Sequence, residues 1–564
     1  MAGLKATATG DEAFAFGALA AGVGLVTGYP GSPSSGTVEA LLEMPEAAEV
    51  QITWAINECI AIEMAFGASL AGRRALLCVK SVGLNVALDP LMTMVLTGCN
   101  AGFVILLGDD PGGWASQNEQ DSRPLAVLAD IPLLEPASPQ EAQEAMITAF
   151  DLSERYNLPV IVRETRALAL SSGPVQRRSA STPRTLPYRR EPMRWISLPV
   201  NVAENHRRLH AKLASIQNEF ETLWLNRTEG KGKLGLIACG AAYGKLNQAL
   251  GPGLLSQFHV LKLGTFQPLP EQTVERFLKR VGQALVVEEN EPHMEQVLSA
   301  LAHRRRLDVT LLGKGTGHFP IGGELTPSEI VSAVSRMAPH VAADLPTTRV
   351  SPRPLPSKNP LCPDCPYIPL FETLLAHIEG LGGRDHTIIV GDPGCMVRAC
   401  QEPFDLLDVK YSLGASVGLA AGLAMAQPPH KVIALSGDSA FLHHGWGGLV
   451  EAARNKVDLL VIVLDNGTTA LSGGQPHAGT AHDTRGRPTA PVDIARIALA
   501  AGAEHTHVID SLDRAKTGHA IRVAFAQSGL NVLIARSPCP RTVALLETHL
   551  RTHTPNNTPN APEH

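Results

Sequence analysis

Acidic and amide side chains follow two predicted strands in the C-terminal third of the chain. Asp438 comes directly after the apolar run KVIALSG, and Asn466 follows LLVIVLD. Because ligands bind beyond the carboxyl ends of strands in open α/β sheets, the two residues are expected at one edge. With the backbone carbonyl of Thr468, they could give Mg²⁺ the oxygen ligands it prefers, shared with a phosphate group. Small residues at Gly437 and Ser439 would let backbone N–H groups approach a diphosphate. Alternatively, GDS and DN are ordinary turns after strands.

Four of the nine cysteines stand in contexts that suggest a shared site. Cys362 and Cys365 form a C-x2-C pair, Cys395 lies in GDPGCM, and Cys539 lies in SPCP. Iron–sulfur clusters are held by four cysteine thiolates, which this pattern could supply. A zinc site is the rival interpretation, although structural zinc sites usually draw on two close pairs. A third interpretation is a set of unrelated buried thiols. That description better fits the remaining five cysteines, which are Cys59, Cys78, Cys99, Cys239 and Cys400.

Short apolar runs alternate with Ala- and Gly-rich helical stretches, which predicts an α/β fold of three domains with parallel sheets. Strands are expected at 102–108, 158–164, 233–240, 259–264, 284–289, 387–392, 431–438, 459–466 and 531–539, and helices at 58–72, 204–224 and 411–426. The three domains are expected at 1–170, 233–344 and 361–550. A Pro- and Arg-rich linker with a helix (171–232) and a second Pro-rich linker (345–360) separate them. Residues 551–564 are expected to form a flexible tail.

The composition is that of a globular chain with several cores. The 564 residues are 44% hydrophobic and 18% charged, and the formal net charge is -6. This charge gives no reason to expect nucleic acid or an anionic membrane as a partner. No run approaches the roughly 18 apolar residues that span a bilayer, and the N-terminus is a poor signal peptide. We therefore expect a cytoplasmic protein without disulfides. Glu288 and Glu289, at a predicted strand end, indicate a solvated loop rather than a metal site.

Several segments resemble a known family. The segment 431–479, with the Ala/Gly-rich helix before it, resembles the GDG-to-N motif of thiamine-diphosphate enzymes, with Ser439 as the third residue. TGYPGSPSSGTVEALLE (27–43), KSVGLNVALDPLM (80–92) and GDDPGGWASQNEQDSR (108–123) resemble the N-terminal domain of indolepyruvate:ferredoxin oxidoreductases and, more loosely, of pyruvate:ferredoxin oxidoreductases. Residues 233–340 resemble their transketolase-C-terminal-like domain. The chain is thus similar to the large (alpha) subunits of this family, which implies pyrimidine-binding, transketolase-C-like and diphosphate-binding domains in that order.

The resemblance implies roles for individual residues. Glu58, in INECIAIEMAFGASLAG, matches the glutamate that hydrogen-bonds N1′ of the aminopyrimidine and so activates the cofactor. Alternatively, Glu58 only favours a helix N-terminus, and Glu63 is the weaker catalytic candidate. Ser32 falls where the pyruvate enzymes place a substrate-contacting threonine, or it belongs to a plain turn.

The same resemblance implies the cofactor ligands. The cofactor-binding set is Gly394, Gly437, Asp438, Ser439 and Asn466. The Mg²⁺ ligands are Asp438, Asn466 and Thr468, and one 4Fe-4S cluster is bound by Cys362, Cys365, Cys395 and Cys539. Trp446 and Leu471 could line an apolar pocket or belong to the core.

The implied reaction is oxidative decarboxylation of a 2-oxoacid to an acyl-CoA. By resemblance, the substrate is an aryl pyruvate such as indolepyruvate or phenylpyruvate, coenzyme A is the co-substrate, and electrons leave through the cluster. The implied partners are a smaller beta- or gamma-type subunit and an external electron acceptor, in a dimer of heterodimers. Two features depart from the family: no ferredoxin-like domain with C-x2-C-x2-C-x3-C-P runs follows Cys539, and no arginine matches the one that holds pyruvate. The main alternative is therefore a non-oxidative thiamine-dependent decarboxylase, and the second is a non-catalytic scaffold subunit that binds the cofactor.

Overall fold

The computed structural model describes residues 5–188, 190–345, 360–426 and 430–543. The chain forms two compact units, Met1–Pro356 and Ser357–His564. Most of the predicted linker at 345–360 and the whole predicted tail at 551–564 lie outside the described residues. In the part of the chain that the structure describes, no helix is both long enough and apolar enough to cross a membrane.

The first sheet of unit 1 has seven strands, and all of its neighbouring pairs are parallel except the one at an edge. Its order is β12 (Thr265–Gln267), β6 (Leu133–Leu134), β7 (Val160–Thr165), β5 (Phe103–Asp109), β4 (Ala75–Lys80), β2 (Leu25–Gly28) and β3 (Gln51–Trp54). Every residue of β5 and β7 is buried, as expected for strands covered on both faces. The predicted strands at 102–108 and 158–164 are confirmed.

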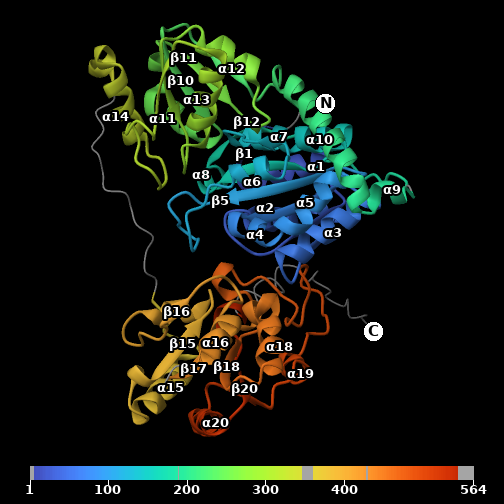
Figure 1. Ribbon diagram of the computed structural model, residues 1–564, viewed down its shortest axis with the longest axis vertical. Coiled ribbons are helices and arrows are strands. Elements are labelled where there is room, and N and C mark those ends of the chain that lie inside the picture. Colours follow the sequence, from blue (N-terminus) through green and yellow to red (C-terminus); the bar gives the residue numbers. More distant parts are fainter. Residues whose placement is uncertain (1–4, 189, 346–359, 427–429, 544–564) are drawn as a thin grey trace, which may run out of the picture. The chain divides into compact units, whose positions relative to one another are not determined.

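Helices pack around this sheet, and loops connect them to its strands (Figure 1). They are α1 (Gly10–Ala20), α2 (Ser35–Glu43), α3 (Glu58–Leu70), α4 (Ser81–Val86), α5 (Leu88–Thr97), α6 (Arg123–Leu128), α7 (Pro139–Tyr156) and α8 (Arg166–Leu170). Thr9 and Glu12 form a reciprocal capping box that starts α1, which packs on α7. The predicted helix at 58–72 is confirmed as α3, which begins at its Asn57 cap.

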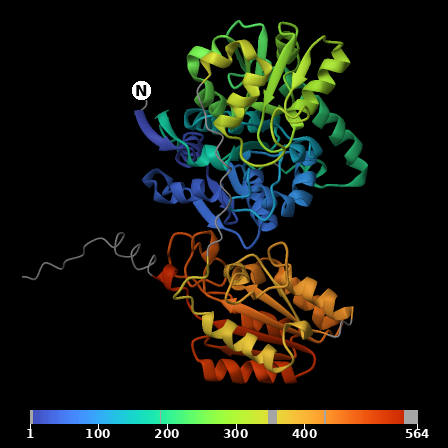
Figure 2. The same ribbon diagram turned by 90° about the vertical axis from the view of Figure 1, so that its left-hand side faces the viewer.

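The predicted linker at 171–232 is packed against unit 1. Its first residues form β8 (Ser172–Gln176), which pairs antiparallel with β1 (Lys5–Thr9). Arg178 and Arg184 then form ion pairs with Glu144 and Glu154 of α7. After the short α9 (Pro192–Trp195), the long helix α10 (Pro199–Phe220) lies along the outside of the unit in both views (Figures 1 and 2).

A second sheet of unit 1 contains the middle segment. Its order is β14 (Thr310–Leu312), β13 (Gln283–Val287), β10 (Leu234–Cys239), β11 (His259–Leu263) and β9 (Arg227–Glu229), with β9 antiparallel. The helices are α11 (Ala241–Leu255), α12 (Glu271–Leu278), α13 (His293–Arg305) and α14 (Pro327–Met337).

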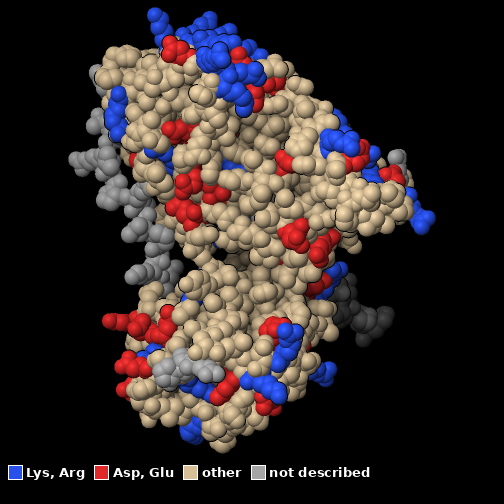
Figure 3. All heavy atoms as spheres, in the orientation of Figure 1, with Lys and Arg blue, Asp and Glu red and all other residues tan. Residues whose placement is uncertain are grey.

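Lys and Arg side chains gather near α12 on the face drawn in Figure 3. Arg304 and Arg305, at the end of α13, form ion pairs with Glu271, the first residue of α12, so part of the positive charge near α12 is neutralised locally.

A buried charge cluster joins the two sheets of unit 1 and corrects one expectation. Glu288 and Glu289 are 1% and 3% exposed, so the predicted solvated loop is wrong. Glu288 accepts the N–H groups that begin α13 and forms a 2.8 Å ion pair with the buried Arg123. Glu289 pairs with Lys245 at 2.5 Å. Strand β12 adds a second link because it follows β11 in the chain yet pairs with β6 of the first sheet.

Unit 2 is one parallel sheet of six strands. Its order is β16 (Val409–Lys410), β15 (Thr387–Gly391), β17 (Lys431–Gly437), β18 (Leu459–Asp465), β20 (Leu530–Arg536) and β19 (His505–Ile509). The helices are α15 (Ile368–Gly380), α16 (Ser416–Met425), α17 (Asp438–Ala440), α18 (Trp446–Arg454), α19 (Ile494–Ala500) and α20 (Arg514–Ala526). Helix α15 packs on α20, and α16 packs on α18. Trp446 and Leu471 are each 47% exposed, so neither belongs to the core of this unit.

Candidate functional site

The first group of predicted site residues lies at the carboxyl edge of the sheet in unit 2. Strands β17 and β18 are neighbours, and Gly437 at the end of β17 pairs with Leu464 of β18. The Asp438 carboxylate is 2% exposed. Its Oδ2 accepts the backbone N–H groups of Asn466 at 3.0 Å and Gly467 at 2.7 Å. The residues after the two strands are therefore in direct contact, which is the arrangement the strand-end argument predicts.

The predicted oxygen ligands of Mg²⁺ keep free acceptor capacity. Asn466 Oδ1 accepts the Thr468 N–H at 3.0 Å, and the Thr468 carbonyl accepts the Ala470 N–H at 3.0 Å. Each oxygen has a second lone pair that a cation could use. A Cβ at Gly437 would meet only Met396 Cε, at 3.9 Å. The space beside this strand end is therefore open, and the residues present fit a metal-bound diphosphate.

Sequence reasoning missed His477, which is 5% exposed on its side chain. Its Nε2 lies 3.2 Å from Asp438 Oδ2, and its Nδ1 accepts the Gly479 N–H at 3.0 Å. Since Nδ1 is an acceptor, the proton of the neutral ring is on Nε2 and faces the carboxylate. Nε2 has no hydrogen-bond partner of good geometry among the described residues. His477 lies 39 residues beyond Asp438, at no spacing that a short motif would reveal.

Gly394 and Asp392 shape the neighbouring strand end. Asp392, directly after β15, is buried and accepts hydrogen bonds from Ser416 Oγ at 2.7 Å and Ser436 Oγ at 2.6 Å. Burial raises the pKa of this carboxyl group. These bonds fix the N-terminus of α16 against β15 and β17. A Cβ at Gly394 would come within 2.9 Å of Met396 Sδ, so the turn has little room for a side chain.

The four predicted cluster cysteines lie close together in unit 2. Burial, together with the charges of Cys365, Cys539 and Cys362, raises the pKa of Cys395 to about 12. Burial likewise raises the pKa of Cys365 to about 11, with contributions from Cys362 and Cys539. No three of the four sulfurs lie within 4.8 Å of one another in the described part of the chain. The Cys400 thiol faces the Met396 carbonyl and stands apart from this group.

The cysteine group adjoins the predicted metal loop. The Cys539 N–H donates to the Asn466 carbonyl at 3.3 Å. Tyr367, which is 1% exposed, has a pKa well above its usual value through burial and through the negative charges of Asp438, Asp465 and Cys365. Its ring therefore lies near both groups. Arg398 Nη1 donates to Cys362 Sγ at 3.7 Å, which places a positive charge beside the thiols.

Glu58, in unit 1, is the first residue of α3 and is 6% exposed. A Cβ at Gly83 would lie 2.8 Å from both Glu58 Cγ and Oε1, so any larger residue there would force the Glu58 side chain to move. Glu63 is exposed on the same helix and accepts the Cys59 thiol at 3.6 Å. The structure therefore separates the two candidates that the sequence offered: Glu58 is held inside the fold and Glu63 faces solvent.

The loop that contains Ser32 lies beside Lys80, a half-buried cation at the end of β4. Ser32 is exposed, and Gly31 packs so tightly on Lys80 that a Cβ there would come within 2.7 Å of Lys80 Cδ. Burial lowers the pKa of Lys80, and the charges of Asp110 and Glu58 oppose this shift. Sequence reasoning had no reason to select Lys80, because only the fold brings the end of β4 next to Glu58 and the loop before α2.

Two family models match the chain. The pyruvate flavodoxin/ferredoxin oxidoreductase thiamine-diphosphate-binding domain covers residues 16–181, and the C-terminal domain of thiamine pyrophosphate enzymes covers residues 392–535. Ser32 and Glu58 lie in the first match, and Asp438 and Asn466 lie in the second. The fold and these matches define a thiamine-diphosphate-dependent oxidoreductase.

Relatives define the family more closely. The indolepyruvate oxidoreductase subunit IorA of Methanothermobacter thermautotrophicus is 35% identical over 94% of this chain and 86% of its own. The Archaeoglobus fulgidus IorA is 34% identical over 95% of this chain and 87% of its own. A solved 2-oxoglutarate:ferredoxin oxidoreductase from Magnetococcus marinus is 17% identical, with a TM-score of 0.47, over 59% of this chain and 65% of that one. The chain belongs to the IorA family of indolepyruvate oxidoreductase subunits.

Proposed function

We propose that this chain catalyses the oxidative decarboxylation of an aryl pyruvate, such as indolepyruvate or phenylpyruvate, to an acyl-CoA, with electrons leaving through a 4Fe-4S cluster. The observation that carries the proposal is the contact between the predicted metal loop and the cysteine group. Asn466 and Cys539 share a backbone hydrogen bond of 3.3 Å, so a redox centre held by the thiols would lie beside the cofactor. Such proximity is what electron transfer from a decarboxylated substrate requires.

The residues at the strand ends would hold the cofactor. Thiamine diphosphate supplies the carbon nucleophile that attacks the ketone of a 2-oxoacid. Asp438, Asn466 and the Thr468 carbonyl would hold Mg²⁺, which binds the diphosphate. The Ser439 N–H donates to Asp438 Oδ1 at 2.8 Å, and Gly437 leaves open space beside it that the diphosphate would occupy. His477 Nε2 lies 3.2 Å from Asp438 Oδ2 and would help to hold this carboxylate in position.

In unit 1, Glu58 and Lys80 are assigned complementary tasks. The Glu58 carboxylate would accept the hydrogen bond from the aminopyrimidine ring and thereby move a proton within the cofactor. Lys80, beside the Ser32 loop, takes the place of the missing arginine and holds the carboxylate of the 2-oxoacid. Its Nζ donates one hydrogen bond to the Ala115 carbonyl at 2.9 Å, which leaves two donors for a substrate.

The spacing of the cysteines favours a multinuclear cluster over a single zinc ion. Four thiolates around one zinc, at bonds of about 2.3 Å, would place the sulfurs about 3.8 Å apart. No three of the described sulfurs lie within 4.8 Å of one another, although their charges act on one another. With pKa values of about 11 and 12 at Cys365 and Cys395, the free thiols are protonated, so cluster assembly must release protons.

A smaller subunit is part of the proposal. The IorA relatives are named as subunits. Near α9, unit 1 exposes Met193 (69%), Ile196 (50%) and Val200 (78%) within eight residues. Clustered exposed apolar side chains mark protein interfaces. We assign this segment to the smaller subunit, in a complex that we expect to be a dimer of heterodimers and to pass electrons to an external acceptor.

Anaerobic purification tests the redox centre. We expect about four irons per chain and a visible absorption that bleaches when thiamine diphosphate, Mg²⁺, coenzyme A and an aryl pyruvate are added. Cys395→Ser should lose the iron, whereas Cys400→Ser should keep it because that thiol faces away from the group. An iron-free protein that releases CO₂ and an aldehyde would instead identify a non-oxidative decarboxylase. A protein that binds the cofactor without turnover would identify a scaffold subunit.

A further inference from the structure

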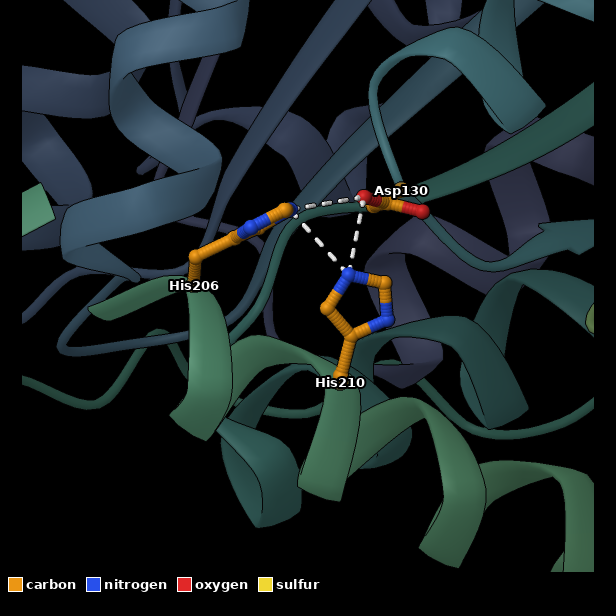
Figure 4. Close-up of side chains that lie close together, drawn as sticks. All are labelled: Asp130, His206 and His210. Atoms are coloured by element: carbon orange, nitrogen blue, oxygen red, sulfur yellow. Dashed lines mark hydrogen bonds and ion pairs between the residues drawn. The ribbon is translucent and has the colours of Figure 1, made fainter. Parts of the chain in front are cut away.

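Two histidines and an aspartate meet on the surface of unit 1, and none of the three is among the residues assigned above. His206 and His210 are one turn apart on α10, so both rings lie on the same face of the helix. Asp130 comes from the turn between α6 and β6 (Figure 4). Figure 4 shows the two rings and the carboxylate pointing toward one another from these separate elements.

The separations match the coordination shell of a metal ion. The two Nε2 atoms are 3.1 Å apart, and Asp130 Oδ2 lies 3.6 Å from His206 Nε2 and 3.8 Å from His210 Nε2. Zinc bonds of about 2.0–2.1 Å in a tetrahedron place the ligand atoms about 3.4 Å apart. In the described part of the chain, this is the group of three whose ligand atoms all lie within 4.8 Å of one another.

The surrounding fold holds the three ligands in place. Leu209 and Leu213 are 3% and 7% exposed and anchor α10 in the core, which fixes the helix face that contains the histidines. Asp130 has a φ of 53°, and the next residue, Ile131, is fully buried. The carboxylate and the imidazoles are therefore presented by packed elements and not by free loops.

We infer that Asp130, His206 and His210 form a binding site for a divalent transition ion of the zinc type. Two imidazoles and one carboxylate suit Zn²⁺, Co²⁺ or Ni²⁺, whereas Mg²⁺ and Ca²⁺ prefer oxygen ligands throughout. The histidine side chains are 54% and 57% exposed, so solvent reaches the fourth coordination position. Asp130 and His210 also border a cavity of about 510 Å³, which gives a small ligand access to that position. The bound ion ties α10 to the turn after α6.

Zinc binding by the full-length chain, with any affinity tag removed, tests the site. The wild type should bind one zinc ion more per chain than His206→Gln, His210→Gln or Asp130→Asn. The matched control is His303→Gln, an exposed histidine on α13 outside the group, which should bind as the wild type does. Removal of a direct ligand should weaken the affinity for zinc by at least about tenfold, because the loss of a residue that only hydrogen-bonds to a ligand already has an effect of that size.

Two further measurements separate this site from the cysteines and from misfolding. Co²⁺ bound here should give visible bands without the thiolate charge-transfer absorption that cysteine ligands produce. Zinc should raise the thermal midpoint of the wild type more than that of the three variants, whose midpoints without metal should equal the wild-type value because the substituted side chains are largely exposed. Equal zinc stoichiometry in all proteins, or only thiolate-bound Co²⁺, would overturn the inference.

Discussion

Replacing Gly83 with alanine should impair the catalytic centre without changing any residue proposed to act in it. A Cβ at this position would lie 2.8 Å from Glu58 Cγ and 2.8 Å from Glu58 Oε1. Ordinary contacts begin near 3.4 Å, so the carboxylate must move by several tenths of an ångström. Glu58 is 6% exposed at the start of α3, and few alternative positions are open to it.

The expected magnitudes follow from this geometry. Forcing a methyl group into a packed site costs about 1–3 kcal/mol, and alanine in a helix is favoured over glycine by about 0.5–1 kcal/mol. We therefore expect Gly83→Ala to lower the free energy of unfolding by about 1–2 kcal/mol. Misplacing a catalytic group by about 1 Å costs about 100-fold in rate, so the smaller shift here should lower kcat about tenfold.

Gly67→Ala is the matched control. Gly67 lies in the interior of α3, and a Cβ there would meet no atom within 4 Å. This variant should gain about 0.5–1 kcal/mol of stability and keep its activity. The measurements are urea unfolding of both variants and steady-state reduction of a one-electron dye in the presence of an aryl pyruvate. If Gly83→Ala matches Gly67→Ala in both, Glu58 is not confined as the structure shows, and the reasoning fails.

Three other substitutions test separate steps of the argument. Glu58→Gln should lower turnover by about 10²–10⁴-fold while circular dichroism and metal binding stay unchanged; unaltered activity would remove Glu58 from the catalytic role. Lys80→Met should raise KM for the 2-oxoacid about ten- to 100-fold through loss of a charged hydrogen bond, and an unchanged KM would count against Lys80 as the carboxylate-binding group. Burial raises the pKa of Asp11 from 3.8 to about 7, so the folded state binds this proton more tightly than the unfolded state does. The protonated Asp11 carboxyl group therefore stabilises the folded state below pH 4. This contribution to the free energy of unfolding, up to about 4 kcal/mol, is lost as the pH rises through 7. Unfolding measured from pH 4 to 8 should therefore depend less on pH in Asp11→Asn than in the wild type, and equal pH profiles would contradict the assignment.

The sequence by itself determined the strands and the residues that follow them. Strands β5, β7, β17 and β18 were predictable because each is a long apolar run between helical stretches, as strands buried on both faces must be. The approach of Asp438 to Asn466 followed from the rule that parallel strands end at one edge. Both inferences use local patterns of residue type and spacing, which can be identified in one amino-acid sequence.

Only the tertiary structure decided which distant side chains meet. Glu288 became a buried partner because Arg123, 165 residues earlier, reaches it from the start of helix α6. His477 approaches Asp438 through a loop, and Lys80 at the end of β4 lies near Glu58 at the start of α3; no local sequence pattern predicts either contact. The meeting of Asp130 with His206 likewise depends on how α10 packs on the core of unit 1. Such contacts arise when whole elements bury their apolar faces together. That burial is driven by the apolar residues, so the sequence spacing of the polar residues does not reveal which of them come into contact.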